Sequence, residues 1–513
     1  MSDLVVAIDA GTQSIRAALV DLSGQIVALE KVTITPYVSP KQGWAEQDGQ
    51  YYWDKLCEAT NRVLAGVDPA RLGAVSLSTQ RQTVLPVDTD GIPLRPAIVW
   101  MDERRADAAK TGTGLLLGAS RLSGAHDVLK FAIEYSRANW LRQHEPEIWD
   151  RTHKFLFLSG FFTHRLTGEF VESTANVFGP WPFDVRKTDW AGPKNLRSFA
   201  FGIERAKLPD LIEPGKPCGQ ITKTAAEQTG LPAGLAFISG ASDKSCDLLG
   251  AGALEPDTGF ISYGTTATFN VFTRKYVEIQ PQLPPYPAAI GGAFHTEVQV
   301  MRGLWLVSWF TEEFGLRERE LAADQHRTPE ELLDELVAST SPGSAGLVTL
   351  PSWTPNPQAD PAMRGAVIGF SDVHTRAHLY RSILEGLALA MREGAEVTTK
   401  KTKQDLTQVR ASGGGSLSDV LMQITADVFD LPTYRAHTAE TSAVGAAILA
   451  AAGVGLHDSI ESAAAQMTRF GRVFEPDEPA TKIYDRLRTE VYRKAPGQLL
   501  GLNRSLKSIF GQN

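Results

Sequence analysis

The residue best placed to do chemistry is an aspartate that directly follows a buried strand. Residues 234–240 (GLAFISG) have the continuous apolar character of a strand buried on both faces, and Asp243 comes three residues later. Ligands of α/β sheets bind beyond the carboxyl ends of strands, where a carboxylate can accept a proton from a hydroxyl during phosphoryl transfer. The same spacing also suits an aspartate that caps a helix beginning near Lys244. The sequence leaves both roles open for Asp243.

Three small-residue turns could hold phosphate groups. They are residues 9–12 (DAGT), 264–266 (GTT) and 413–416 (GGGS). Glycine lets backbone N–H groups approach an anion closely, and threonine hydroxyls add further donors. Each turn alone is typical of an ordinary loop, but the three together predict a nucleotide cradle. No GxxxxGK[ST] element is present, and no GxGxxG follows a strand to open a helix, so P-loop and Rossmann sites are excluded.

The elements that must position these turns recur along the chain. Predicted strands at 4–8 and 15–20 flank the first turn, and strands at 259–263 and 267–272 flank the second. This repetition favours two related lobes, which we expect at residues 1–250 and 251–513; two unrelated hairpins are the alternative. Helical periodicity at 376–397 and 417–429, mixed with these strands, predicts an α/β fold.

Composition excludes several classes of protein. The 513 residues include 51 basic and 59 acidic side chains, a net charge of −8, which argues against nucleic acid as a partner. Three cysteines lie far apart without metal spacing, and the N-terminus has no export signal, so we expect a cytoplasmic protein. The apolar stretch 441–457 is too short to span a membrane, and no membrane partner is expected. A homodimer is one assembly that the sequence leaves open.

The order of motifs along the whole chain resembles that of the FGGY carbohydrate kinases. The motifs are DAGTQS at 9–14, GWAEQD at 43–48, WMD at 100–102, GASD at 240–243, GTT at 264–266, LEG at 384–386, GGGS at 413–416 and ETSAVGAA at 440–447. The resemblance implies two ribonuclease-H-like lobes of the actin/hexokinase/heat-shock-ATPase fold with a cleft between them. It also implies that sugar binds in the first lobe, that ATP binds against the second, and that Mg²⁺ is required.

The resemblance assigns roles to individual residues. Asp243 matches the catalytic base, and Asp9 matches a carboxylate near the magnesium ion and phosphates, so both carboxylates are expected to contact the metal indirectly through water. Substrate contacts are implied for Asp243 and for Arg81, Gln82, Trp100 and Asp102. Contacts to ATP or its phosphates are implied for Asp9, Thr12, Gln13, Ser14, Arg16, Gly264, Thr265, Gly414, Gly415 and Ser418.

The substrate is less sharply indicated. Residues 140–148 and 166–169 are similar to xylulose kinases, whereas residues 79–83 resemble the segment in which glycerol kinases hold their triol. Lys244 stands where the family has Gln or Asn, and Arg137 stands where it has a lysine. These departures bear on substrate choice more than on catalysis. We expect phosphorylation of a primary hydroxyl of a pentulose such as D-xylulose. The alternatives are a kinase of glycerol or another short polyol and, in another class, a non-catalytic sugar sensor or actin-like protein.

Overall fold

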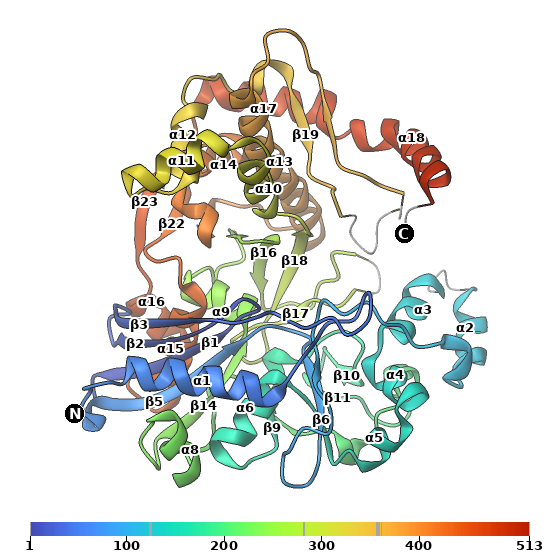
Figure 1. The fold of residues 1–513 in the computed structure, drawn as a ribbon, viewed down its shortest axis with the longest axis vertical. Coiled ribbons are helices and arrows are strands. Elements are labelled where there is room, and N and C mark those ends of the chain that lie inside the picture. The colour runs from blue at the N-terminus through green and yellow to red at the C-terminus, as the bar shows by residue number, and fades with distance from the viewer. Residues whose placement is uncertain (1, 123–125, 281–282, 355–359, 361, 512–513) are drawn as a thin grey trace. The chain divides into compact units, whose positions relative to one another are not determined.

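The chain folds into two compact units (Figure 1), described in a computed structural model for residues 2–122, 126–280, 283–354, 360 and 362–511. Unit 1 comprises Met1–Gly252, Thr273–His295 and Thr441–Arg469, and unit 2 comprises Ala253–Phe272, Thr296–Glu440 and Phe470–Asn513. The sequence suggested two uninterrupted lobes, at 1–250 and 251–513. In the structure, two later segments of the chain pack with unit 1 instead.

Unit 1 is built on a six-stranded sheet of order β13-β14-β5-β1-β2-β3. The bounds are β1 Leu4–Ala10, β2 Ser14–Asp21, β3 Ile26–Thr33, β5 Leu72–Thr79, β13 Pro217–Gln220 and β14 Ala236–Ser242. The hairpins β1–β2 and β2–β3 are antiparallel, β5 runs parallel to both β1 and β14, and β13 is antiparallel to β14. The strands predicted around the first turn and before Asp243 are therefore confirmed.

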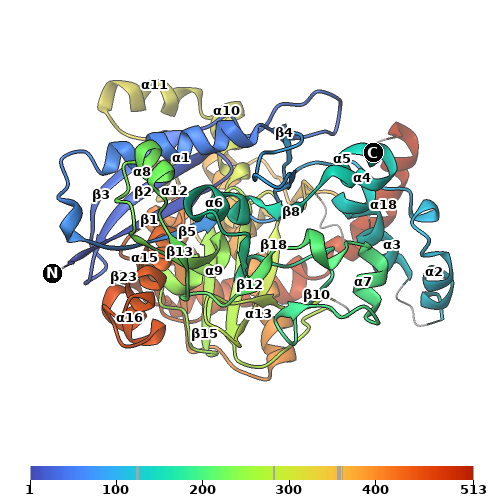
Figure 2. The same cartoon turned by 90° about the horizontal axis from the view of Figure 1, so that it is seen from below.

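Helices cover both faces of this sheet (Figure 2). On one face, Trp53 of α1 (Gly49–Val63) packs into the same apolar cluster as Val6 and Ile8 of β1. Alternate strand residues point to the opposite face, where α15 (Thr441–Gly453) lies against β1, β5 and β14. A Cβ at Gly445 of α15 would lie 2.1 Å from the carbonyl oxygen of Cys246, so glycine permits close packing of α15 on α9 (Asp243–Gly250).

Unit 2 repeats the strand order of unit 1. Its sheet has the order β18-β16-β15-β21-β22-β23. The bounds are β15 Thr258–Tyr263, β16 Ala267–Thr273, β18 Phe294–Val300, β21 Gln408–Ser412, β22 Thr433–Ala436 and β23 Phe470–Phe474. The short strand β17 (Tyr286–Pro287) and the first two residues of β18 lie in the segment assigned to unit 1. An antiparallel β15–β16 hairpin, two parallel pairings and a final antiparallel strand follow as in unit 1. The two predicted hairpins therefore belong to related folds.

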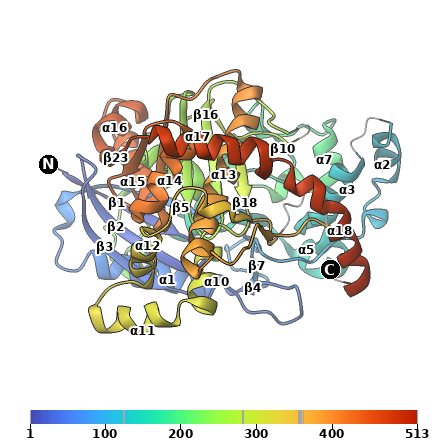
Figure 3. The same ribbon diagram turned by 90° about the horizontal axis from the view of Figure 1, so that it is seen from above.

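The predicted helices of unit 2 are confirmed with small changes of bounds. The periodic stretch from residue 376 forms α13 (Arg376–Thr402), and the stretch after the triple glycine forms α14 (Asp419–Phe429). Figure 3 shows α17 (Glu478–Leu487) and α18 (Ala495–Phe510) following one another towards the C-terminus. Across the described part of the chain, no helix has both the length and the apolar character needed to cross a bilayer.

Candidate active site

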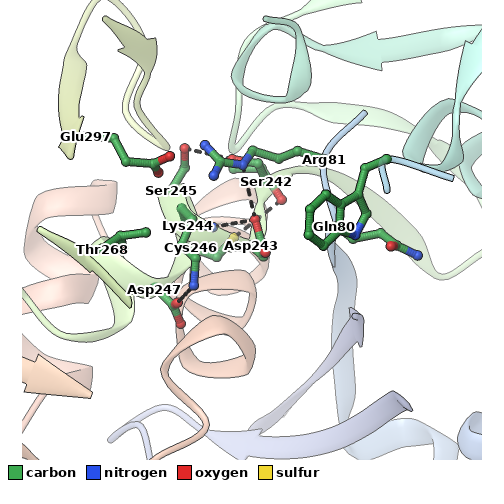
Figure 4. A network of polar contacts seen from close by, with 12 residues as sticks. Gln80, Arg81, Ser242, Asp243, Lys244, Ser245, Cys246, Asp247, Thr268 and Glu297 are labelled. Carbon is green, nitrogen blue, oxygen red and sulfur yellow. Dashed lines mark hydrogen bonds and ion pairs between the residues drawn. The ribbon is translucent and has the colours of Figure 1, made fainter. Parts of the chain in front are cut away.

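Asp243 stands at the junction between β14 and α9 in unit 1 (Figure 4). Its Oδ1 accepts the backbone N–H of Lys244 at 2.8 Å and lies 3.6 Å from Nε of Arg81. By backbone conformation the helix cap is Ser242, and Asp243 is the first helical residue. The carboxylate therefore contacts the first turn of α9, yet 30% of the side chain stays exposed and can be reached by a ligand.

The surroundings of Asp243 make it a stronger base than a free aspartate. Desolvation by burial raises the pKa of Asp243 above its usual value, while the positive charges of Lys244 and Arg81 oppose that rise. A carboxylate with a raised pKa accepts a proton more readily from a neutral hydroxyl.

Aromatic side chains hold Arg81 beside Asp243. The guanidinium carbon of Arg81 lies 5.0 Å from the ring centre of Phe178 and 4.8 Å from that of Tyr286. The next residue, Gln82, has a φ of +62°, a left-handed conformation that non-glycine residues seldom adopt. Its amide nitrogen donates to the carbonyl oxygen of Phe178, so this amide supports the loop.

In the first predicted turn, Asp9 and Thr12 have different side-chain partners. Asp9, which is 4% exposed, forms an ion pair with Arg16 across the hairpin, at 3.0 Å between Oδ2 and Nη1. Thr12 Oγ1 donates to Gln80 Oε1 at 3.1 Å and accepts from Trp100 Nε1 at 3.0 Å. Its hydroxyl thus fixes the turn.

The remaining residues of this turn differ in exposure. Ser14 is buried at the start of β2, whereas Gln13 is exposed at the tip. Among the residues the structure describes, the N–H groups of Thr12 and Gln13 make no hydrogen bond. The turn therefore offers two backbone donors, which suits an anion.

Asp102 occupies a different environment from the other predicted substrate residues. Its side chain is 0% exposed, and its oxygens accept hydrogen bonds from the N–H of Ala45 at 2.7 Å and from the backbone and guanidinium of Arg104 at 2.7–2.9 Å. Arg137 donates to the backbone carbonyls of Asp102 and Arg104. The Asp102 carboxylate therefore organises a buried ion-pair cluster, and a direct substrate contact stays a prediction.

The predicted nucleotide turns of unit 2 are formed mainly by backbone. The carbonyl of Gly264 accepts the N–H of Leu304 at 2.9 Å, and Thr265 is exposed at the tip between β15 and β16. A Cβ at Gly415 would lie 2.9 Å from both Leu304 and Tyr263, so this glycine is closely packed. At Gly414 a Cβ would meet only Leu304, at 4.0 Å, which leaves this exposed position open to a ligand.

Ser418 has a structural partner in unit 2. Its hydroxyl accepts the N–H of Leu421 at 3.0 Å and caps α14. A nucleotide contact by this serine stays a prediction.

The two carboxylates assigned to magnesium fit that ion in their chemistry. Mg²⁺ prefers hard oxygen donors, keeps several waters and is commonly held by one or two carboxylates together with phosphates. Asp9 and Asp243 supply two such carboxylates in unit 1. Within the described residues no cluster of three or more His, Cys, Asp or Glu could hold a metal ion.

Sequence reasoning missed Asp247 and its partners, which support the helix that begins at Asp243. Asp247 accepts Thr441 Oγ1 at 2.8 Å and Ser442 Oγ at 2.7 Å, and its other oxygen lies 3.3 Å from Nζ of Lys244 (Figure 4). Asp247 therefore links Lys244 on α9 to the start of α15. A carboxylate four residues after Asp243 on one helix was a signal for this role, but partners almost 200 residues away in the sequence gave none.

Comparison with known proteins agrees with this architecture. The profile of the FGGY family of carbohydrate kinases matches residues 4–250 with its N-terminal domain and 259–454 with its C-terminal domain. An uncharacterized sugar kinase of Escherichia coli K12, YgcE, is 31% identical over 95% of this chain and 92% of its own length. A xylulose kinase of Lactococcus lactis is 28% identical over 89% of each chain.

Solved structures show the same fold. A ligand-bound xylulose kinase from Lactobacillus acidophilus superposes with a TM-score of 0.82 at 22% identity, covering 97% of this chain and 98% of its own. Its fold is thus shared along nearly the whole chain, including both repeated sheets. With family profiles matching both halves of the sequence, the chain belongs to the FGGY family of carbohydrate kinases.

Proposed function

We propose that this kinase transfers the γ-phosphoryl group of ATP to a primary hydroxyl of a pentulose such as D-xylulose, with Asp243 as general base. The observation that carries the proposal is the Asp243 carboxylate itself. It follows a parallel strand, remains 30% exposed, lies 3.6 Å from Arg81, and has a raised pKa.

The reaction follows from these groups. Asp243 takes the proton of the acceptor hydroxyl as its oxygen bonds to the γ-phosphorus, the bond from that phosphorus to the β,γ-bridging oxygen breaks, and ADP leaves. The N–H groups of Thr12 and Gln13 would donate hydrogen bonds to phosphate oxygens. Bound Mg²⁺ would neutralise charge on the phosphates, and Asp9 and Asp243 would hold its water shell.

The choice of a pentulose over glycerol rests on the neutral side chain at position 82, where a charged one would bind a triol more tightly. A tight site for a triol needs well-placed, preferably charged, hydrogen bonds. Arg81 is retained, but its neighbour is the neutral Gln82, whose amide is bound to Phe178. The smaller Ala132 stands where glycerol kinases have a tyrosine, which suits a longer substrate.

The test is an ADP-release screen with the full chain, ATP and Mg²⁺ over glycerol, tetritols, pentuloses, pentitols and hexuloses. Acceptor-dependent release that is strongest with a pentulose is the expected result. Strongest release with glycerol would overturn the substrate. Absence of any acceptor-dependent release, together with filament formation, would instead favour an actin-like protein.

A further inference from the structure

Behind the Asp243 strand lies a buried carboxyl group, Glu172, that the reaction does not use. Glu172 is in β9 (Val171–Ser173), is 1% exposed and lines a small internal cavity with Ser239. Its oxygens accept Ser159 Oγ at 2.8 and 2.9 Å, Asn176 Nδ2 at 2.9 Å and the N–H of Ser173 at 3.0 Å. No Lys or Arg pairs with Glu172 within the described part of the chain.

Burying a carboxylate without a cation costs free energy, which hydrogen bonds and protonation of the group reduce. Burial raises the pKa of Glu172 to about 7. Glycine at position 160 makes room for the Glu172 side chain, because a Cβ there would lie 2.9 Å from Glu172 Oε2. The hydrogen bonds that Glu172 accepts fix the start of the segment 172–179, called here the support segment.

The first end of the support segment holds the strand that carries Asp243. Ser173 Oγ donates to the carbonyl oxygen of Gly240 at 2.6 Å, three residues before Asp243 on β14. Gly240 packs closely on the neighbouring strand β5, since a Cβ there would lie 1.7 Å from the carbonyl oxygen of Leu77. A displacement at Glu172 would therefore be transmitted to the strand that precedes Asp243 through the side chain of Ser173.

The other end of the support segment holds Arg81. Phe178 lies 5.0 Å from the guanidinium carbon of Arg81, and its carbonyl accepts the amide of Gln82. Gly179 has a φ of +84°, and a Cβ there would lie 2.4 Å from the Gln82 amide nitrogen. The left-handed backbone at Gln82 is therefore kept in place by contacts from this segment.

We propose that Glu172 is a positioning residue that anchors the support segment and so sets the distance and orientation of Arg81 relative to Asp243. The inference rests on the proposed function, in which Asp243 is the base. A displacement of about 1 Å in such a constellation costs on the order of 10²-fold in rate. The role requires no contact between Glu172 and the substrate.

The experiment compares Glu172→Gln and Ser173→Ala with Glu385→Gln in the full chain. Glu385 is an equally buried carboxylate in unit 2, bound to Arg381, Tyr484 and Ser344, and is the control for loss of stability alone. For each variant, kcat and KM are measured with ATP and D-xylulose, or with the best acceptor of the screen. The pH profile of kcat/KM is recorded as well, because a purely structural role would not shift its acid limb.

Glu172→Gln is expected to lower kcat/KM for the acceptor by roughly 10- to 100-fold with little change in KM for ATP. Its acid limb should move to higher pH, because Arg81 then lowers the Asp243 pKa less. Ser173→Ala should show the same changes to a smaller degree, and Glu385→Gln should show neither. Wild-type kcat and an unshifted acid limb in Glu172→Gln would overturn the inference. Retained turnover in Asp243→Asn would instead overturn the proposed function, and the positioning role with it.

Discussion

The two repeated hairpins share a scaffold but differ in the residues they present. In β1–β2, Asp9 faces Arg16 one pair before the turn; in β15–β16 the corresponding pair is Ser262 and Thr268. The first hairpin thus carries an ion pair close to the turn that is predicted to bind phosphate, and the second is neutral at that register. Because the strand order around both hairpins is the same, the difference lies in side-chain chemistry. Under the proposed function, unit 1 would supply the charged groups of the reaction, and unit 2 would bind the nucleotide mainly through its backbone.

The largest expected effect concerns Asp243. Asp243→Asn keeps the shape of the side chain but removes the proton acceptor, so kcat should fall by about 10²–10⁴-fold. Stopped-flow or coupled ADP assays at saturating ATP measure this, with thermal unfolding as a control for the fold. Near-wild-type turnover would mean that Asp243 serves only the first turn of α9 and that unit 1 does not hold the base.

The second prediction tests the hairpin comparison directly. Asp9→Asn removes the negative charge that the proposed function places at the water shell of Mg²⁺. Loss of one charge-assisted hydrogen bond from the transition state costs about 1.5–3 kcal/mol, so kcat/KM should fall roughly 10- to 100-fold. Ser262→Ala, at the matching place in unit 2, should stay within about threefold of wild type. Equal losses of kcat/KM in both variants would contradict the difference between the two hairpins, since they would show that the charge at Asp9 has no special role.

The third prediction separates two adjacent glycines of unit 2. Gly414→Val should raise KM for ATP by about tenfold, equivalent to roughly 1.4 kcal/mol, and leave the acceptor KM unchanged, because its Cβ points into open space. Gly415→Val should instead lower stability by about 1–3 kcal/mol, because its Cβ meets Leu304 and Tyr263. Weakened acceptor binding in Gly414→Val would show that the glycine turn does not face the nucleotide.

The fourth prediction concerns the pH dependence of the free energy of unfolding. The pKa of Glu172 is raised to about 7 in the folded state, so the native protein holds this proton more tightly than the unfolded chain does. Its contribution of about 3 kcal/mol is therefore fully present below about pH 4.5 and lost as pH rises to about 7. Cys218, in the same cavity, has a pKa raised to about 12 and stays neutral throughout. Urea unfolding of wild type and Glu172→Gln across this window measures the difference, and identical pH slopes would contradict it.

Much of the fold could be predicted from local sequence, and less of the site. The hairpins, α13, α14 and the strand before Asp243 follow from apolar periodicity and turn residues, which are local signals. The return of residues 441–469 to unit 1 depends on the close packing of α15 on α9, which no local pattern contains.

The arrangement of the side chains was harder to predict for the same reason. The Arg81–Asp243 pair joins residues 162 positions apart, and its aromatic support comes from Phe178 and Tyr286. The left-handed conformation of Gln82 has no sequence signature, because it is imposed by contacts with the support segment.

A competition between two acceptors tests the proposed pentulose kinase activity most directly. The full chain is incubated with ATP, Mg²⁺ and equal concentrations of D-xylulose and glycerol, and the products are identified by phosphorus NMR. A phosphate ester of D-xylulose at a primary carbon is expected as the main product, in amounts equal to the ADP released. A predominance of glycerol phosphate, or ADP and inorganic phosphate without any ester, would contradict it.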